Sequence, residues 1–196
     1  MYRSAVGKLE FVEPIYKKLC KKYFESLEIW SSYIEFLFDV RAEGKTEFTD
    51  PKVILQKSLQ ALPKSLHINM ISKYGILEYK NGHIESGRTM FEGIVNNYPK
   101  RMDIWSIYMD MEVKHGGKDN AVQARHLFER CLSLPEIKRK PRSMKLVFMK
   151  YMEFEQQNGN KGKLSQLRQR VEEYLETAFK EDKESSGSCE SGSDSD

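Results

Sequence analysis

A dense group of basic side chains in this 196-residue sequence lies in PEIKRKPRSMK, residues 135–145. Pro135 and Pro141 are expected to hold the segment out of a helix. Cationic side chains on an extended segment can contact successive phosphates, which requires charge but no base-specific geometry. The segment is therefore a candidate RNA-binding site, with solvated surface and a nuclear import signal as open alternatives. Its five cations are Lys138, Arg139, Lys140, Arg142 and Lys145.

Signatures of catalysis and of cofactor or metal binding are missing from the sequence. The motifs H-E-x-x-H, C-x-x-C, G-x-S-x-G and G-x-G-x-x-G do not occur. Gly44-Lys45-Thr46 matches the end of a phosphate-binding loop, but Asp39 stands where the loop needs its first glycine. Three widely spaced cysteines argue against a zinc site or a disulfide framework. We expect no enzymatic activity, no cofactor, no metal and no small-molecule substrate.

A second group of charged residues recurs along the chain. An aromatic or aliphatic anchor is followed by Tyr at +3, an apolar residue at +6, Glu at +7 and Gly at +11. A divergent first copy has Trp30 and Tyr33, but Leu37 replaces its glutamate. The anchors of the other three copies are Ile71, Trp105 and Phe148. Their tyrosines and glutamates are Tyr74 and Glu78, Tyr108 and Glu112, and Tyr151 and Glu155.

A second helical pattern follows each copy and reads basic-x-x-apolar, then Glu or Gln. Its basic residues are Lys52, Arg88, Arg125 and Arg168. Successive anchors are 41, 34 and 43 residues apart, and periods of this size with two helices each indicate an α-helical solenoid. The alternation typical of strands is absent from the sequence. We predict an all-α, right-handed solenoid of about four helix pairs plus a leading helix.

The repeated glutamates predict ion pairs. On a helical wheel, the +7 position lies about 20° from the anchor and borders the packed face. A partly buried carboxylate is unfavourable unless it is paired. Each copy that has the glutamate also has the arginine of its own second helix, so we expect each pair to form within one repeat. The expected pairs are Glu78 with Arg88, Glu112 with Arg125, and Glu155 with Arg168.

The two tryptophans, Trp30 and Trp105, have two interpretations. Exposed indoles could provide stacking platforms for RNA bases. Their helical spacing to a tyrosine instead favours packing in the core between helices.

Together, W-x-x-Y-x-x-x-E and a second helix with R-x-x-[F/Y]-E and a closing proline resemble the half-a-TPR (HAT) repeat, a TPR-like helix pair found in RNA-processing proteins. Residues 82–116, GHIESGRTMFEGIVNNYPKRMDIWSIYMDMEVKHG, are similar to the C-terminal HAT region of the ribosomal RNA-processing protein five family, whose full-length members also carry S1 RNA-binding domains. The resemblance covers roughly residues 10–180. It implies a HAT-repeat solenoid over that range.

The resemblance also implies a function. It points to a non-catalytic scaffold for pre-rRNA processing and ribosome biogenesis in the nucleus and nucleolus. The implied partners are pre-ribosomal protein components, and direct contact with pre-rRNA is left open. HAT arrays also occur in factors for pre-mRNA splicing and mRNA 3′-end processing, which is the alternative function.

The two ends of the chain differ from its middle. Residues 1–9 form an N-terminal extension, and the following PIYKKLCKKYF has the pattern of a second helix without a first. That pattern predicts a fragment of a larger protein or the product of a split gene. Residues 181–196 carry six acids and one lysine, net −5, which leaves +8 on the remainder. A basic body is compatible with an anionic partner such as RNA.

The acidic, Ser-rich segment 181–196 is expected to be disordered, because it has too few apolar residues to form a core. Ser191 and Ser193 each have an acidic residue at +3 and are candidate phosphorylation sites. No apolar run reaches the roughly 18 residues needed to cross a bilayer, so no membrane partner is expected.

Overall fold

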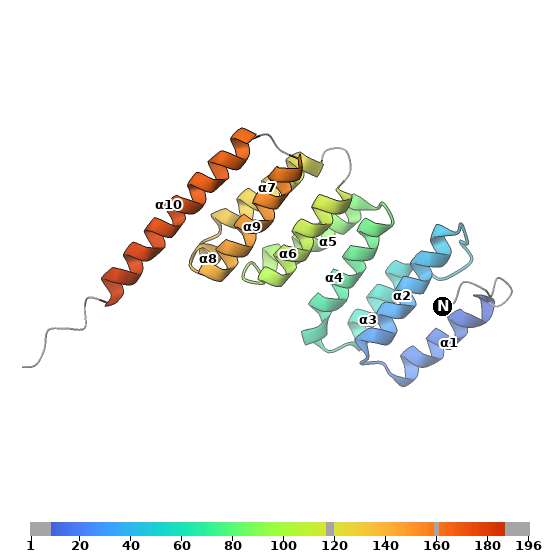
Figure 1. Ribbon diagram of the computed structural model, residues 1–196. Coiled ribbons are helices and arrows are strands. Elements are labelled where there is room, and N and C mark those ends of the chain that lie inside the picture. The colour runs from blue at the N-terminus through green and yellow to red at the C-terminus, as the bar shows by residue number, and fades with distance from the viewer. Residues whose placement is uncertain (1–8, 117–119, 159–160, 187–196) are drawn as a thin grey trace, which may run out of the picture. The chain divides into compact units, whose positions relative to one another are not determined.

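The computed structural model describes residues 9–116, 120–158 and 161–186. These residues form ten α-helices and no strand, so the all-α prediction is confirmed (Figure 1). The helices are α1 (Leu9–Lys22), α2 (Leu27–Ala42), α3 (Pro51–Ala61), α4 (Lys64–Lys80), α5 (Ile84–Asn97), α6 (Met102–His115), α7 (Asn120–Ser133), α8 (Pro135–Lys138), α9 (Pro141–Asn158) and α10 (Lys161–Ser186).

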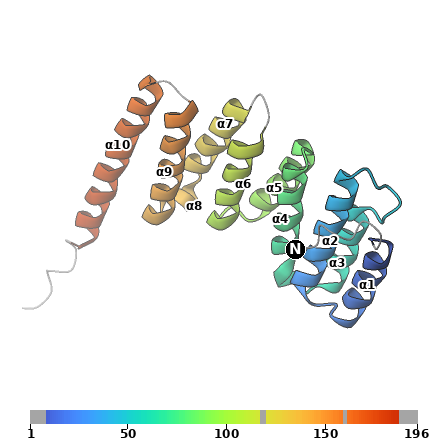
Figure 2. The same cartoon turned by 45° about the vertical axis from the view of Figure 1, so that its right-hand side comes forward.

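The chain divides into two compact units, residues 1–118 with α1–α6 and residues 119–196 with α7–α10. In the first unit, α2, α4 and α6 follow one another in a row, and α3 and α5 form a second row behind them (Figure 2). In the second unit, α9 packs against α7 and α10, and the short α8 contacts α7 and α9. Within each unit, long helices pack on their neighbours in the chain, as expected for stacked helical repeats.

Trp30 and Trp105 belong to the core of the first unit. They are 7% and 1% exposed. Each indole also donates a hydrogen bond to a backbone carbonyl oxygen six residues earlier: Trp30 Nε1 to Phe24 at 2.7 Å, and Trp105 Nε1 to Pro99 at 3.0 Å. Each tryptophan therefore ties its helix to the preceding turn, and neither indole face is free to stack on a base.

Helices α4 and α5 approach each other at two glycines. A Cβ atom added to Gly87 would lie 2.5 Å from the ring of Tyr79, and one added to Gly75 would lie 3.0 Å from Phe91. A methyl group at Gly87 would therefore require the Tyr79 ring or the helices to shift, and one at Gly75 would require a smaller movement of Phe91. Small residues thus fix the spacing within this helix pair.

The turn between α4 and α5 uses the glycine that the repeat pattern places after the first helix. Gly82 has φ +82°, a left-handed conformation that glycine adopts without a steric penalty. The amide of His83 then donates to the carbonyl oxygen of Glu78 at 2.9 Å, as in a Schellman motif. This turn places the His83 ring next to the Glu78 carboxylate.

Two expectations about the chain's course were wrong. Pro135 and Pro141 were expected to keep the basic segment extended, but each begins a helix, α8 and α9. Proline fits the first helical turn, because the N–H group it lacks has no partner there. Helix α10 also continues to Ser186, past the expected start of a disordered tail at residue 181. Ser191 and Ser193 lie outside the described residues.

Candidate interaction site

The basic cluster, Lys138, Arg139, Lys140, Arg142 and Lys145, spans the end of α8 and the start of α9. All five of its side chains are exposed. Arg142 and Lys145 lie one helical turn apart and therefore project from the same side of α9. The cluster thus lies at the corner between α8 and α9. Phosphate contact depends on charge and does not require an extended backbone.

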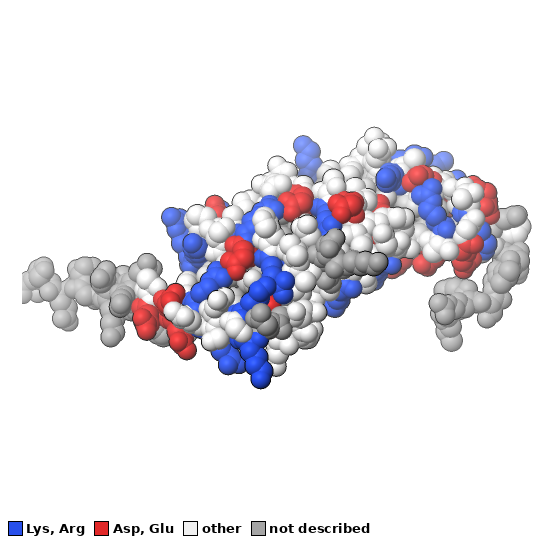
Figure 3. Space-filling model, turned by 90° about the horizontal axis from the view of Figure 1, so that it is seen from above, with Lys and Arg blue, Asp and Glu red and all other residues white. Residues whose placement is uncertain are grey.

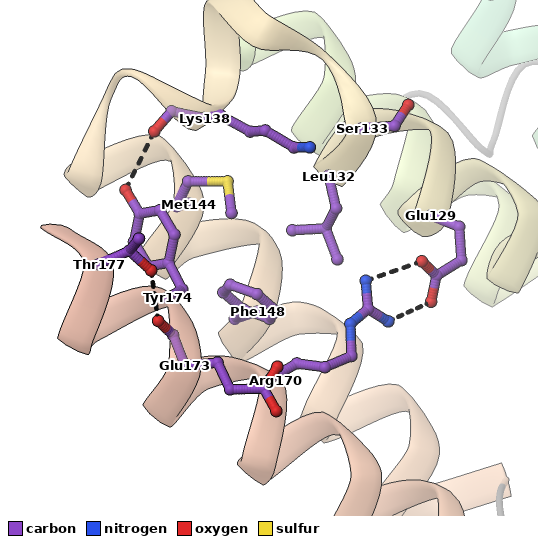
Figure 4. A pocket seen from close by; sticks show the side chains of 10 residues that line it. All are labelled: Glu129, Leu132, Ser133, Lys138, Met144, Phe148, Arg170, Glu173, Tyr174 and Thr177. Carbon is purple, nitrogen blue, oxygen red and sulfur yellow. Dashed lines mark hydrogen bonds and ion pairs between the residues drawn. The ribbon is translucent and has the colours of Figure 1, made fainter.

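A pocket of about 320 Å³ adjoins this cluster and is lined by α7, α8, α9 and α10 (Figure 4). Arg170 and Glu129 close one side through two hydrogen bonds, 2.7 and 2.9 Å long. The Arg170 guanidinium lowers the pKa of the Glu129 carboxyl below its ordinary value. On the other side, the Tyr174 hydroxyl donates to the backbone oxygen of Lys138 at 3.1 Å. The side chain of Lys138 extends across the pocket toward Leu132.

The charged residues of the repeats form ion pairs of their own. Arg88 of α5 holds Glu112 of α6 through two hydrogen bonds, Nε to Oε1 at 2.6 Å and Nη2 to Oε2 at 2.9 Å. The hydroxyl of Tyr79 donates to Oε1 of the same carboxylate at 2.5 Å. The Glu112 side chain is only 2% exposed. The hydrogen bond with Glu112 raises the pKa of Arg88. The buried Glu112 carboxylate therefore has a partner that stays positively charged.

The same pair recurs between α7 and α9 in the second unit. Arg125 Nε lies 2.6 Å from Glu155 Oε1, and Arg125 Nη2 lies 3.2 Å from Glu155 Oε2. The Glu155 side chain is 1% exposed, and its hydrogen bond raises the pKa of Arg125. In both places the arginine comes from the second helix of one repeat and the glutamate from the first helix of the next. We call these two ion pairs the inter-repeat clasps.

A stacked ring pair accompanies each clasp. Phe91 stacks on Tyr108 with ring centroids 5.3 Å apart and planes 9° apart. Phe128 stacks on Tyr151 at 4.8 Å and 4°. The Tyr108 hydroxyl then donates to Glu92 at 3.0 Å. Arg, Phe and Glu of the R-x-x-F-E pattern thus all contact the first helix of the following repeat.

The prediction that these ion pairs form within one repeat was therefore wrong. The observed partners are Arg88 for Glu112, Arg125 for Glu155, and His83 for Glu78, with His83 Nδ1 2.9 Å from the carboxylate. The pattern alone could not decide, because consecutive repeats carry both residues, and Glu112 and Glu155 each have a candidate arginine on either side.

The divergent first copy contains the signal that could have decided. Glu13 lies three residues before Tyr16, as Arg88 lies three residues before Phe91. The leading helix therefore lacks the arginine at the interface where Leu37 replaces the glutamate. Both halves of the clasp are missing from one inter-repeat interface, which is the result expected of pairing between repeats.

The requirements of a metal site and of a membrane span can be compared with the described residues. None of its His, Cys, Asp and Glu side chains form a group of three or more that could hold a metal ion. No described helix has the length and apolarity needed to cross a membrane. On the face shown in Figure 3, basic and acidic side chains are intermingled.

Stacked helix pairs with clasps and ring stacks at their junctions define a helical-repeat protein. The family model of the PRP39 N-terminal HAT repeat matches residues 52–184. The chain therefore belongs to the HAT-repeat family.

The curated relatives that the chain resembles are named for two processes, rRNA biogenesis and pre-mRNA splicing. The chain is 34% identical over 175 residues to the rRNA biogenesis protein rrp5 of Schizosaccharomyces pombe, covering 89% of this chain and 10% of that protein. It is 33% identical over 172 residues to the rRNA biogenesis protein RRP5 of Arabidopsis thaliana, covering 87% and 8%. It is also 28% identical over 140 residues to the pre-mRNA-splicing factor SYF1 of Mycosarcoma maydis, covering 70% and 12%. The chain thus spans about a tenth of the length of these relatives.

Proposed function

We propose that this chain is a non-catalytic helical-repeat scaffold in pre-rRNA processing and ribosomal subunit biogenesis, acting in the nucleus and nucleolus. The observation that carries the proposal is the similarity to two proteins named for rRNA biogenesis over 89% and 87% of the chain. The similarity to a splicing factor is weaker, 28% identity over 70% of the chain. Pre-ribosomal proteins are the proposed partners.

The inter-repeat clasps support a scaffold role. Buried, doubly hydrogen-bonded ion pairs fix the position of one helix on the next. Ring stacks beside them restrict rotation of the helices about the contact. Within each unit, helices fixed in this way present a preformed surface, so partner binding there needs little ordering of the chain.

Isolation of crosslinked RNA from cells tests the process directly. A tagged chain is crosslinked with ultraviolet light in cells, purified under denaturing conditions, and its bound RNA is sequenced; proteins are identified from a parallel native purification. We expect pre-ribosomal proteins, with any crosslinked RNA derived from pre-rRNA. Spliceosomal proteins and small nuclear RNAs in their place would reject the proposal and support the splicing alternative.

Direct RNA contact is proposed at the basic cluster. Each phosphate contact releases counterions when RNA binds. For single-stranded RNA, each contact therefore lowers the logarithm of the affinity by about 0.7 for every tenfold rise in salt concentration. Changing Lys138, Arg139, Lys140, Arg142 and Lys145 to Ala should therefore weaken binding and flatten the salt dependence.

A matched control variant loses the same charge elsewhere. It changes five other exposed lysines, which are Lys52, Lys57, Lys64, Lys80 and Lys100. RNA affinity is measured for both variants and the original chain across a salt series, with circular dichroism to check folding. Equal losses in the two variants would show that only net charge matters, and the cluster would then be ordinary surface.

A further inference from the structure

Helix α10 carries a third copy of the sequence pattern that forms the clasps. Arg168, Val171 and Glu172 occupy the positions that Arg88, Phe91 and Glu92 occupy in α5. Four residues after Val171 comes Leu175, the counterpart of Val95 in α5 and Leu132 in α7. We call Arg168, Val171, Glu172 and Leu175 the α10 docking face.

The equivalent faces of α5 and α7 are covered. In α5, Phe91 and Val95 are 0% and 1% exposed, and in α7, Phe128 and Leu132 are 1% and 3% exposed. The covering element is each time the first helix of the next repeat, α6 or α9. It contributes a tyrosine to the ring stack and a glutamate, four residues later, to the clasp.

The α10 docking face, by contrast, is open. Leu175 is 46% exposed, Arg168 and Glu172 are exposed as well, and Val171 is half-buried. Among the described residues, none forms an ion pair or a hydrogen bond with the side chain of Arg168. Helix α10 instead turns another side to its neighbours, with Leu167 3% exposed and Tyr174 close to Phe148 of α9.

The chemistry of this face differs from that of the basic cluster. It combines a cation, a carboxylate and two aliphatic side chains on adjacent turns. The carboxylate would repel a phosphate backbone, whereas a helix with its own carboxylate and hydroxyl matches both charged groups. An aliphatic residue can serve in place of the phenylalanine, because Leu55 holds this position in α3 and is buried in the same core cluster as Tyr74 of α4.

We infer that the α10 docking face binds an amphipathic helix of a partner protein that presents a tyrosine and, four residues later, a glutamate. The glutamate pairs with Arg168, the tyrosine ring covers Val171 and Leu175, and the tyrosine hydroxyl donates to Glu172. The contacts with Arg168, Val171 and Glu172 copy those that the structure shows for Arg88, Phe91 and Glu92 of α5. This inference concerns a protein partner and does not depend on the process in which the scaffold acts.

The probe is a fluorescent peptide of residues 99–116, which contains Tyr108 and Glu112. A lactam between Asp110 and Lys114 keeps it helical, and these residues lie on the side of the helix opposite Tyr108 and Glu112. Fluorescence anisotropy is measured with the full 196-residue chain. Arg168→Ala should weaken binding roughly ten- to hundredfold, the effect of losing one charge-assisted contact.

Two matched variants decide whether Arg168 acts as proposed. Lys161→Ala removes a charge from another exposed position of α10 and should leave the affinity unchanged. Arg168→Glu should abolish binding of the original peptide, and a peptide with Glu112→Arg should restore it. Such rescue requires direct contact between residue 168 and the peptide. If the peptide instead displaced α6 and bound to α5, its affinity would not depend on residue 168.

Three results would overturn the inference. One is equal peptide affinity for the original chain and Arg168→Ala. Another is no binding at millimolar peptide with the lactam helix confirmed by circular dichroism. The third is concentration-dependent self-association of the chain, by light scattering, that Arg168→Glu abolishes, because the occupant would then be a second copy of this chain.

Discussion

The interface between α1 and α2 and the interface between α5 and α6 use the same ring stack with opposite arrangements of charge. Tyr16 stacks on Tyr33 at 5.1 Å and 8°, and Phe91 stacks on Tyr108 at 5.3 Å and 9°. The near-identical geometry shows that the stacked rings suit either arrangement of charge.

The polar groups beside the two stacks differ. At α5–α6, Arg88 is on the second helix and the buried carboxylate, Glu112, is on the following first helix. At α1–α2 the carboxylate itself, Glu13, is on the second helix. It accepts hydrogen bonds from Tyr33 at 2.9 Å and from Thr49, and pairs with Lys17 at 3.0 Å.

The difference teaches what the fold requires at a junction between repeats. A buried carboxylate is tolerated on either helix, provided that donors satisfy it. The arginine is needed only where the glutamate of the repeat is present. Consequently, the two interfaces should respond differently to loss of their cations.

The largest expected effect is that of Arg88→Ala. It leaves the Glu112 carboxylate buried with Tyr79 as its remaining donor, and removing one partner of a buried pair costs about 3–5 kcal/mol. The corresponding cation at α1–α2, Lys17, is 53% exposed, so Lys17→Ala should cost about 1 kcal/mol or less. Urea unfolding at pH 7 measures both. Similar costs would remove the proposed distinction between the interfaces.

A smaller effect is expected at Gly87. The corresponding position in α1 is Val12, so α1 accommodates a side chain there. A Cβ atom on Gly87 would instead meet the ring of Tyr79. Gly87→Ala should destabilise the chain by about 1–3 kcal/mol through overpacking. Gly93→Ala is the matched control, because it lies in the same helix with open space around its Cα, and it should stabilise by about 0.5–1 kcal/mol. Thermal unfolding of both variants tests the prediction; stabilisation by both would contradict tight packing of α4 on α5.

The smallest effect concerns the pH dependence of the α1–α2 interface. Burial alone would raise the pKa of Glu13, but hydrogen bonds from Thr49, Lys17 and Tyr33 lower it below its ordinary 4.5. A carboxyl with a lowered folded-state pKa stabilises the fold above the unfolded pKa. That stabilisation is lost as the pH falls through the folded pKa, at about 1.4 kcal/mol per unit of pKa difference.

The test of this pH effect compares the original chain with Glu13→Gln. The glutamine cannot ionise, so the stability difference between the two proteins should shrink between pH 6 and pH 3. Urea unfolding across this range supplies the measurement. A stability difference that stayed constant across this pH range would mean that ionisation of Glu13 does not stabilise the folded protein.

Much of the fold follows from the sequence, because its signals are local and repeated. The Trp-x-x-Tyr spacing predicts a helical face, and both tryptophans are buried on it. Gly82 ends α4 in the left-handed conformation that its place in the repeat pattern suggests.

Other features depend on contacts that the sequence does not specify. The prolines at 135 and 141 are compatible with an extended segment or a helix start, and packing of Ile137, which is fully buried, favours the helix. The Arg170–Glu129 pair joins residues 41 positions apart, a separation that no helical spacing marks. The partner of each repeated glutamate is ambiguous in the regular copies, and only the divergent first copy, with Glu13 and Leu37, carries a sequence signal that favours pairing between repeats.

The central claim is that Glu112 and Glu155 each pair with the arginine of the preceding repeat. A double-mutant cycle on Glu112 tests it, using Glu112→Gln with Arg88→Ala and, separately, with Arg125→Ala, each measured by urea unfolding. Residues that form a pair should couple by roughly 0.5–3 kcal/mol, and residues without contact should be additive within about 0.5 kcal/mol. We predict coupling of Glu112 to Arg88 and additivity with Arg125. Additivity with Arg88 and coupling to Arg125 would contradict the inter-repeat clasp and restore pairing within a repeat.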